Sequence, residues 1–331
     1  MPNDRCLTVY GPLVQQIELL WRRQCDEWDM LRTGRADLQA ALTRSFVVDG
    51  SRVIAQCNWA RVRSAAARVD AASVAARPCF LCEPNLPAGQ RAVAYQDGWR
   101  ILCNPAPIFD PHFTIVRTTH EPQLLELCLE VLLDLARDLD SRYTVFYNGP
   151  FAGASAPDHA HLQASPAGAT PFENELAVEL CVDRANNGPK WIEWLRRGAV
   201  RVGLTRPGRR PAVIVMGSDR QAIIAAVQEV LHGLQAIHPA QPEPMLNLLA
   251  TFTDQRWLVW LHPRQAHRPS CYGQEPDRYL ISPGAVDLAG LLIAPRRADF
   301  ERLDGPTIRS IYFEVLLSPD KFAQLRQRLA G

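Results

Sequence analysis

The segment from Asn148 to Gln163, NGPFAGASAPDHAHLQ, holds the residues best suited to chemistry. Its second part predicts a strand, on which alternate side chains share a face. His159, His161 and Gln163 should therefore point one way, and the residues between them into the protein. Two imidazoles and an amide beside a Gly- and Ser-rich turn indicate a phosphate site. A lone histidine in a strand is more often a satisfied core residue, but two at this spacing after this loop favour a functional role.

The Cys-x-x-Cys pair at Cys79 and Cys82 is the second group with a chemical spacing. A thioredoxin-like redox pair opens a helix after a strand, whereas this one runs into a loop marked by Pro84 and Pro87. A metal site fits better, provided that two more ligands exist, because structural zinc takes four. Two unliganded core thiols are the alternative.

Composition limits the classes of protein to which these groups can belong. A chain of 331 residues that is 47% hydrophobic can bury a large core and favours two domains or one elaborate one. The formal charge of +1 gives no general attraction to nucleic acid or membrane. The start of the chain lacks a signal-peptide pattern, and no stretch approaches the about 18 apolar residues of a membrane span. Nine scattered cysteines favour reduced thiols, so we expect a cytoplasmic protein.

The chain around the loop predicts alternating strands and helices, from hydrophobic periodicity and turn residues. Before the loop we expect a helical region (11–43), a hairpin around Asp49-Gly50 leading into residues 58–63, an Ala-rich helical segment, a hairpin around Asp97-Gly98, a strand (112–117), a helix (123–141) with Leu124, Leu127, Leu132 and Leu135 on its apolar flank, and a strand (142–149). After it we expect a helical region (173–198) with Trp191 and Trp194 in the core, a strand (212–217), a helix (219–237), two strands (245–252 and 256–263), a buried strand (281–295) and helices (306–329).

The part of the chain after Ser165 faintly repeats the part before it. A β-rich run, a basic turn and His267-Arg268-Pro269 echo the strand and turn near His120, but no His-x-His-x-Gln accompanies them. An inactive second copy of the same scaffold is the simplest account of such an echo. Arg264, His267 and Arg268 are either surface charges or form a basic turn that holds a terminal phosphate. Asp287, the one acid in its apolar run, should be paired or functional.

The segment from Pro78 to Ser165 resembles the histidine-triad (HIT) superfamily. The resemblance rests on the Cys-x-x-Cys, on a strand of the "HTLVIPKRH" type from His112 to His120, on the following helix and on the His-x-His strand. Gln163 stands where the third histidine usually lies. In this respect the chain resembles the transferase branch, which includes galactose-1-phosphate uridylyltransferase, the diadenosine tetraphosphate phosphorylases and the GDP-hexose phosphorylases.

Two further segments are more loosely similar to this branch. Residues 56–61, QCNWAR, resemble the "QLNEGR" strand of the GDP-hexose phosphorylases, and residues 281–290 resemble their late "NPAxxEISGH" strand. In the uridylyltransferases an Asn-x-Gly precedes the histidines, and here Asn148 precedes His161 by 13 residues, although Gly149 follows Asn148 directly. The resemblance thus implies that Asn148, Gly149, Asn58 and Arg61 bind substrate.

The resemblance also implies a catalytic role for each group of the opening motif. A neutral imidazole of His161 can attack the α-phosphorus of a nucleotide and form a nucleotidyl-histidine, while its other ring nitrogen donates to a backbone carbonyl. Gln163 can donate a hydrogen bond to a phosphate oxygen without adding a charge. The Ser155 hydroxyl and the loop amides near Gly153 can take up the developing negative charge.

Zinc-containing members of the superfamily assign the remaining histidines. Carried over by motif position, the zinc ligands are Cys79, Cys82, His120 and His159, which would close four tetrahedral positions of a structural site. His112 is the rival for the third ligand. Not all members of this branch keep zinc.

We therefore expect an α+β protein with two HIT-like lobes, each an antiparallel sheet with covering helices. The expected parts are an N-terminal helical region and hairpin (1–76), a catalytic lobe (77–168) and a degenerate second lobe (169–331). The expected function is a nucleotidyltransferase of phosphorylase type that moves a nucleoside monophosphate from a dinucleoside polyphosphate or NDP-sugar to phosphate or a sugar phosphate. The alternatives are a nucleotide hydrolase of the same fold and a nonenzymatic nucleotide-binding protein. No nucleic-acid or membrane partner is expected, and homodimer formation stays open.

Overall fold

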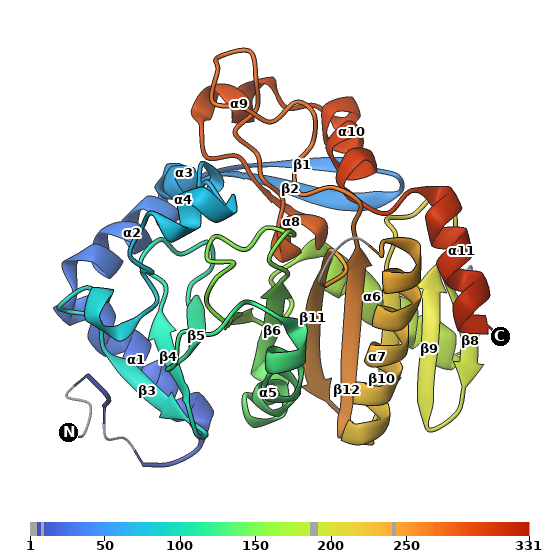
Figure 1. Cartoon of the computed structure of the whole chain (residues 1–331), viewed down its shortest axis with the longest axis horizontal. Helices are drawn as coiled ribbons and strands as arrows, with labels where there is room; N and C mark the ends of the chain where they lie inside the picture. The colour runs from blue at the N-terminus through green and yellow to red at the C-terminus, as the bar shows by residue number, and fades with distance from the viewer. Residues whose placement is uncertain (1–4, 8–9, 186–190, 240–242, 331) are drawn as a thin grey trace.

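The computed structural model describes residues 5–7, 10–185, 191–239 and 243–330. Within these residues the chain forms a large antiparallel sheet and a small three-stranded sheet, with helices packed around both (Figure 1). The predicted α+β class with antiparallel sheets is confirmed.

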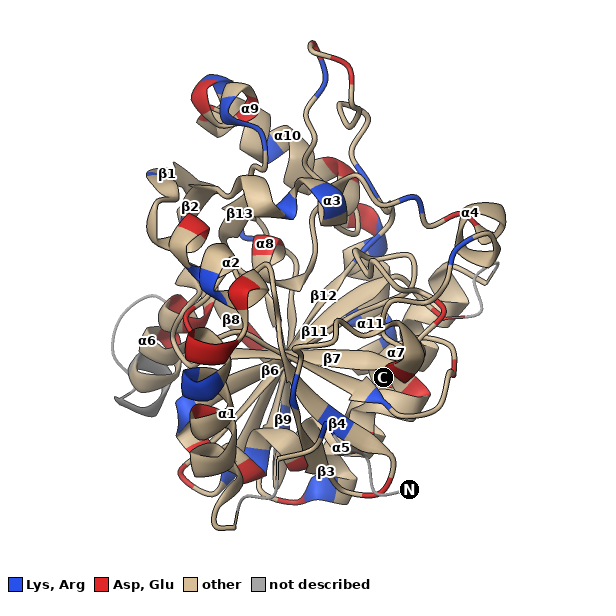
Figure 2. Cartoon of the chain, turned by 90° about the vertical axis from the view of Figure 1, so that its left-hand side faces the viewer, with Lys and Arg blue, Asp and Glu red and all other residues tan. Residues whose placement is uncertain are grey.

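Ten strands of the described residues form the large sheet, in the order β3-β4-β5-β7-β6-β11-β12-β10-β9-β8. These strands are β3 (Ala92–Tyr95), β4 (Trp99–Cys103), β5 (Phe113–Arg117), β6 (Tyr143–Asn148), β7 (His161–Pro166), β8 (Ile192–Arg197), β9 (Val200–Thr205), β10 (Val213–Gly217), β11 (Leu246–Thr253) and β12 (Arg256–Pro263). Figure 2 shows the strands fanning out, which reflects the twist of the sheet.

The helices of the described residues pack mostly against the large sheet or against the small one. They are α1 (Leu13–Glu27), α2 (Asp29–Gln39), α3 (Val62–Ala65), α4 (Ala71–Ala75), α5 (Leu125–Asp138), α6 (Pro171–Ala185), α7 (Arg220–Ile237), α8 (Ala285–Leu288), α9 (Arg297–Arg302), α10 (Gly305–Val315) and α11 (Pro319–Ala330). Short 3₁₀ helices lie at Trp59–Arg61, Glu83–Asn85 and Asp140–Arg142.

The two halves of the large sheet have the same connectivity. In each half a hairpin is followed by a strand, a helix and two more strands: β3-β4, β5, α5, β6 and β7, then β8-β9, β10, α7, β11 and β12. The halves meet at β6 and β11, which pair antiparallel from Asn148 opposite Asn247 to Val145 opposite Ala250. The echo expected in the sequence is thus present in the topology, but the two expected sheets form one continuous sheet.

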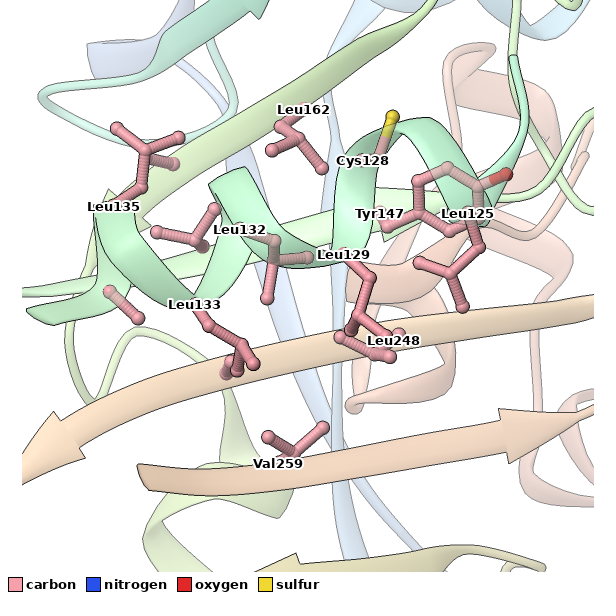
Figure 3. Packing of buried hydrophobic residues seen from close by; sticks show 14 of the residues in the cluster. Leu125, Cys128, Leu129, Leu132, Leu133, Leu135, Tyr147, Leu162, Leu248 and Val259 are labelled. Atoms are coloured by element: carbon pink, nitrogen blue, oxygen red, sulfur yellow. The ribbon is translucent and has the colours of Figure 1, made fainter. Parts of the chain in front are cut away.

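Helix α5 packs across the junction between the halves. Its buried residues recur at helical spacing, as Leu125, Leu129 and Leu132 do, and they contact strands from both sides. Figure 3 shows Leu162 of β7 and Leu248 of β11 meeting this helix. Helices α1, α7 and α11 contribute to the same core on this face of the sheet. Leu127, expected on the apolar flank, is exposed instead.

The opposite face carries the chemistry-bearing side chains and is partly covered by a cap. The cap contains the small sheet of β1 (Leu42–Val48), β2 (Ser51–Cys57) and β13 (Leu291–Ile293), together with α8, α9 and α10. The predicted turn at Asp49-Gly50 is confirmed, because both residues have positive φ, 50° and 68°, as a two-residue hairpin with the matching twist requires.

Three of the expected secondary-structure segments are wrong. The helical region expected over residues 11–43 is two helices that break at Trp28, and strand β1 already begins at Leu42. The region expected to be helical over 173–198 is helix only to Ala185, and Ile192–Arg197 is strand β8, because pairing with β9 overrides local propensity. Residues 186–190 lie outside the described residues.

The third wrong expectation concerns the C-terminal part of the chain. Residues 281–295, expected to form one buried strand, form helix α8 and the short strand β13.

Trp191 and Trp194 pack against the core as predicted, with the Trp191 ring 5.6 Å from the Phe172 ring.

Charge is distributed without a dominant sign. Figure 2 shows basic and acidic residues interspersed along α1 and α9, in keeping with the formal charge of +1. No helix in the described part of the chain is both long enough and apolar enough to cross a membrane.

Candidate active site

The buried Gln123 holds the site together where β6 and β7 separate. Its Nε2 donates to the backbone oxygens of Asn148 (2.9 Å) and His161 (3.0 Å), and its Oε1 accepts from the His161 N–H at 2.7 Å. These three bonds satisfy buried backbone groups that the strand ladder leaves unpaired. Sequence reasoning missed Gln123, whose only signal is a polar residue just before an apolar helix.

His161 has the hydrogen bonding expected of a nucleophile. It begins β7 and is 5% exposed, and its Nδ1 lies 2.8 Å from the backbone oxygen of His159. A carbonyl oxygen can only accept, so Nδ1 carries the hydrogen and Nε2 keeps its lone pair. Burial lowers the pKa of His161 to about 4, so the imidazole is neutral near pH 7. The sequence had predicted His159 on the same strand, but His159 lies in the turn before β7.

Gln163 is oriented by His112. The Ile108 N–H donates to His112 Nδ1 at 3.3 Å, so Nε2 carries the ring hydrogen and donates to Gln163 Oε1 at 3.0 Å. With its oxygen engaged, the Gln163 amide presents its NH₂ group to the pocket that it lines. Burial, with Arg61 nearby, lowers the pKa of His112 to about 3, which keeps this ring neutral. His112 is thus paired with Gln163.

The loop after β6 approaches the cap closely. Asn148, Gly153 and Ser155 line the pocket beside Gln163. Gly153 has a φ of +98°, and a Cβ there would lie 2.8 Å from the Gly284 Cα and 2.9 Å from the Pro283 oxygen. Only glycine fits this position without a shift. The Gly149 N–H donates to the Leu246 oxygen, which ties the start of the loop to β11.

Helix α8 of the cap and two neighbouring segments form the other side of the pocket. Arg61 comes from the 3₁₀ helix after β2, His267 and Arg268 come from the loop after β12, and Asp287 of α8 is the one acid among the described lining residues. Asp287 is paired as expected, because its carboxylate accepts from the N–H groups of Gly284 and Ile293. Burial raises the pKa of Asp287 to about 6 and lowers that of His267 to about 4.

Of the residues expected to bind substrate, Asn58 and Arg264 do not line the pocket, whereas Arg61 does. Asn58 donates to the Pro107 oxygen at 3.0 Å, and Arg61 donates to the neighbouring Ala106 oxygen at 3.1 Å. The QCNWAR segment thus supports the loop whose Ile108 N–H holds His112. Arg264 does not line the pocket; it is 1% exposed and donates to four oxygens of the protein.

Cys79, Cys82, His120 and His159 form a cluster that could hold a metal ion. Their ligand atoms all lie within 4.8 Å of one another. Cys79 Sγ is 3.3 Å from His159 Nδ1, and Cys82 Sγ is 3.2 Å from His120 Nδ1. A tetrahedral zinc with bonds of about 2.0–2.3 Å separates sulfur and nitrogen ligands by about 3.5 Å. The predicted set of four residues is therefore brought together, and His112 is not part of it.

Surrounding groups orient the two histidines of the cluster. His159 Nε2 lies 2.8 Å from the Arg117 backbone oxygen, so Nε2 carries the hydrogen and Nδ1 has its lone pair free to coordinate. His120 Nε2 lies 3.7 Å from the Asp158 carboxylate. Metal-binding histidines commonly have such partners on the second ring nitrogen. The donor set and its orientation therefore fit a metal.

Comparisons with known proteins agree with this fold. A family model described as a domain of unknown function (DUF4922) matches residues 20–166. No curated protein sequence matches the chain significantly. The crystal structure of yeast Ap4A phosphorylase Apa2 in complex with Ap4A is similar, with 17% sequence identity, a TM-score of 0.55 and coverage of 93% of this chain and 99% of that one. The same phosphorylase in complex with AMP has 14% identity, a TM-score of 0.51 and coverage of 88% and 98%. The chain thus has the fold of this phosphorylase, which agrees with the fold expected from the sequence.

Proposed function

We propose that the protein is a nucleotidyltransferase that works through a covalent nucleotidyl-His161. The observation that carries the proposal is the state of His161: its Nδ1–H is fixed by the His159 oxygen, burial keeps the ring neutral, and Nε2 is left to attack. The residues beside it, Asn148 and Gln163, line a pocket with amide groups suited to phosphate oxygens.

The reaction has two displacements at phosphorus. In the first, the Nε2 lone pair forms a bond to the α-phosphorus, and the P–O bond to the leaving phosphate group breaks with its electron pair on oxygen. In the second, an acceptor oxygen attacks the phosphorus, and the N–P bond breaks and returns the lone pair to Nε2. The Gln163 amide and the Ser155 hydroxyl would stabilise the charge on the phosphate oxygens in both steps.

The basic side of the pocket supports a phosphorylated acceptor or leaving group. Arg61 and Arg268 are opposite in charge to a phosphate and line the same pocket as Gln163. We propose a dinucleoside polyphosphate or an NDP-sugar as donor and phosphate or a sugar phosphate as acceptor. The likeness to a fold that binds Ap4A and AMP in yeast Ap4A phosphorylase supports a nucleotide donor.

We further propose that the metal cluster holds zinc in a structural role. Two thiolates and two imidazoles are a zinc donor set, and four protein ligands close the tetrahedron to substrate. Because His159 would be a ligand and its backbone oxygen fixes His161, a bound ion would steady the position of the nucleophile. Cys79 and Cys82 would bind as thiolates.

Intact-protein mass spectrometry with a panel of dinucleotides and NDP-sugars tests the proposal. Wild-type protein should gain the mass of one nucleoside monophosphate in an acid-labile bond, and His161→Ala should not. His232→Ala, on the exposed side of α7, is the matched control and should retain the adduct. An undiminished adduct in His161→Ala would sink the assignment.

Phosphate dependence separates the related activities. Turnover that requires added phosphate or sugar phosphate identifies a transferase, whereas turnover in water alone identifies a hydrolase. Tight binding of nucleotides with no turnover and no adduct would identify a nonenzymatic nucleotide-binding protein.

A further inference from the structure

A chain of buried hydrogen bonds runs from the second half of the sheet to Asn148. Arg264 Nη1 donates to Asn247 Oδ1 at 3.0 Å, and Asn247 Nδ2 donates to Asn148 Oδ1 at 2.8 Å. Asn247 Nδ2 also donates to the Ala152 oxygen at 2.6 Å. Every polar atom of the Asn247 side chain is thereby used. The direction of this amide is fixed because Arg264 can only donate.

The orientation of Asn148 follows from this chain. Its Oδ1 accepts a second hydrogen bond, from the Ala285 N–H at 2.7 Å, so both lone pairs of the oxygen are occupied. Turning the amide over would set its NH₂ group against two other donors, those of Asn247 and Ala285. The NH₂ group of Asn148 forms no hydrogen bond within the described residues and belongs to a residue that lines the pocket.

Arg264 is built to hold this arrangement. Besides Asn247, its guanidinium donates to the backbone oxygens of Pro283, Ala266 and His267, and it is almost fully buried. No N–H of the guanidinium is left for a substrate. A charged side chain with all its donors used by protein oxygens is a rigid anchor.

We propose that Asn247 and Arg264 are positioning residues that fix the Asn148 amide with its NH₂ group toward the substrate phosphate. Both come from the half of the sheet that lacks the nucleophile: Asn247 is in β11, directly opposite Asn148 in β6, and Arg264 directly follows β12. The second half thus acts on the reaction by fixing a hydrogen-bond donor of the first. This inference rests on the proposed function, because it assigns the Asn148 donor to that function's substrate.

Replacing Asn247 by aspartate tests the role with almost no change in shape. A carboxylate at this position still accepts from Arg264 but can no longer donate to Asn148. In this variant the Asn148 oxygen faces the new carboxylate, and turning the amide over would set its NH₂ group against the Ala285 N–H. Neither orientation satisfies both neighbours, so the NH₂ group is no longer fixed toward the phosphate. Asn247→Leu, which removes the donor without adding a charge, is the second variant and guards against a fold or charge effect in the first. Thr251→Val, a buried change on the same face of β11, is the matched control.

Calorimetric titration with AMP, GMP, CMP and UMP identifies the tightest nucleoside monophosphate, which is then used for all variants. Asn148→Ala should weaken its binding about tenfold to a hundredfold, as expected for one hydrogen bond to a charged group. Asn247→Asp should weaken binding to a similar extent, and Asn247→Leu to a smaller extent, because in Asn247→Leu the Ala285 N–H still holds the Asn148 oxygen. Combining either with Asn148→Ala should add nothing further, because all three changes act through the same donor. Thr251→Val should bind like wild type.

The double-variant cycle decides between positioning and a general effect. Losses that multiply in the double variants, or wild-type affinity in both Asn247 variants, would overturn the positioning role while wild-type binding still upheld the proposed function. Wild-type protein that binds no nucleotide and forms no adduct would overturn the proposed function and this role with it.

Discussion

Two buried histidines, His112 and His262, give the protein a calculable sensitivity to acid. Burial lowers the pKa of each to about 3, and nearby guanidinium groups add to the effect: Arg61 beside His112, and Arg210 and Arg264 beside His262. Both rings are therefore neutral in the folded protein, whereas in the unfolded chain their pKa is about 6.5. Below that pH the unfolded state binds more protons than the folded state. The free energy of unfolding is therefore highest, as far as these two histidines decide it, above pH 6.5, and it falls as the pH decreases toward 3.

The expected loss can be worked out for a convenient pH. Between pH 8 and pH 5 each histidine costs about 2 kcal/mol of unfolding free energy, or about 4 kcal/mol for the pair. The value depends on the unfolded pKa and hardly changes while the folded pKa stays below about 4. A loss of this size is a large part of the stability of a typical domain.

Urea unfolding at the two pH values measures the effect of His262. In His262→Gln the difference in unfolding free energy between pH 8 and pH 5 should shrink by about 2 kcal/mol relative to wild type. Any constant cost of the substitution cancels in this difference, including loss of the bond from His262 Nδ1 to the Pro211 oxygen. Thr251→Val, which removes no titrating group, should keep the wild-type difference. An unchanged difference in His262→Gln would refute the reasoning.

Three further predictions concern the site itself. Gly153→Ala should cost about 2–4 kcal/mol in urea unfolding, because its Cβ meets the backbone at Gly284 and φ is positive; wild-type stability would contradict the close approach. Cys79→Ser should lower bound zinc from about one equivalent, read by elemental analysis, and equal metal content in both proteins would remove Cys79 from the ligand set. Gln123→Leu should cost about 2–4 kcal/mol and speed hydrogen exchange of the His161 N–H, since three buried bonds are lost; unchanged exchange would exclude Gln123 as the clamp.

Local signals in the sequence predicted much of the fold, and the family resemblance implied the metal cluster. The hairpin turns at Asp49-Gly50 and Asp97-Gly98 depend on neighbouring residues alone, and both form. The spacing of Cys79 and Cys82 indicated a metal site, the resemblance to zinc-containing HIT proteins implied His120 and His159 as the other two ligands, and the structure brings all four together.

The contacts that position the site could not be predicted in this way. Asn247 lies in an apolar run and its partner Asn148 is 99 positions away, so its role exists only because β6 pairs with β11. His112 could be linked to Gln163 only once β5 and β7 were known to be neighbours. The strand Ile192–Arg197 was expected to be helical because its pairing with β9, and not its composition, determines its structure.

The β6–β11 junction resembles the isologous contact of a symmetric dimer, with one peptide chain in place of two. In a true dimer every change occurs in both copies, whereas a fused pair can specialise each copy separately. In the second half of the sheet, which lacks the His-x-His-x-Gln motif, His262 of β12 packs against Phe172 in a core that also contains Trp260. Cutting the chain into its halves would expose β6 as an unpaired sheet edge and remove Asn247 from Asn148. The two halves share one sheet, so complementation by separately expressed halves would have to rebuild this junction.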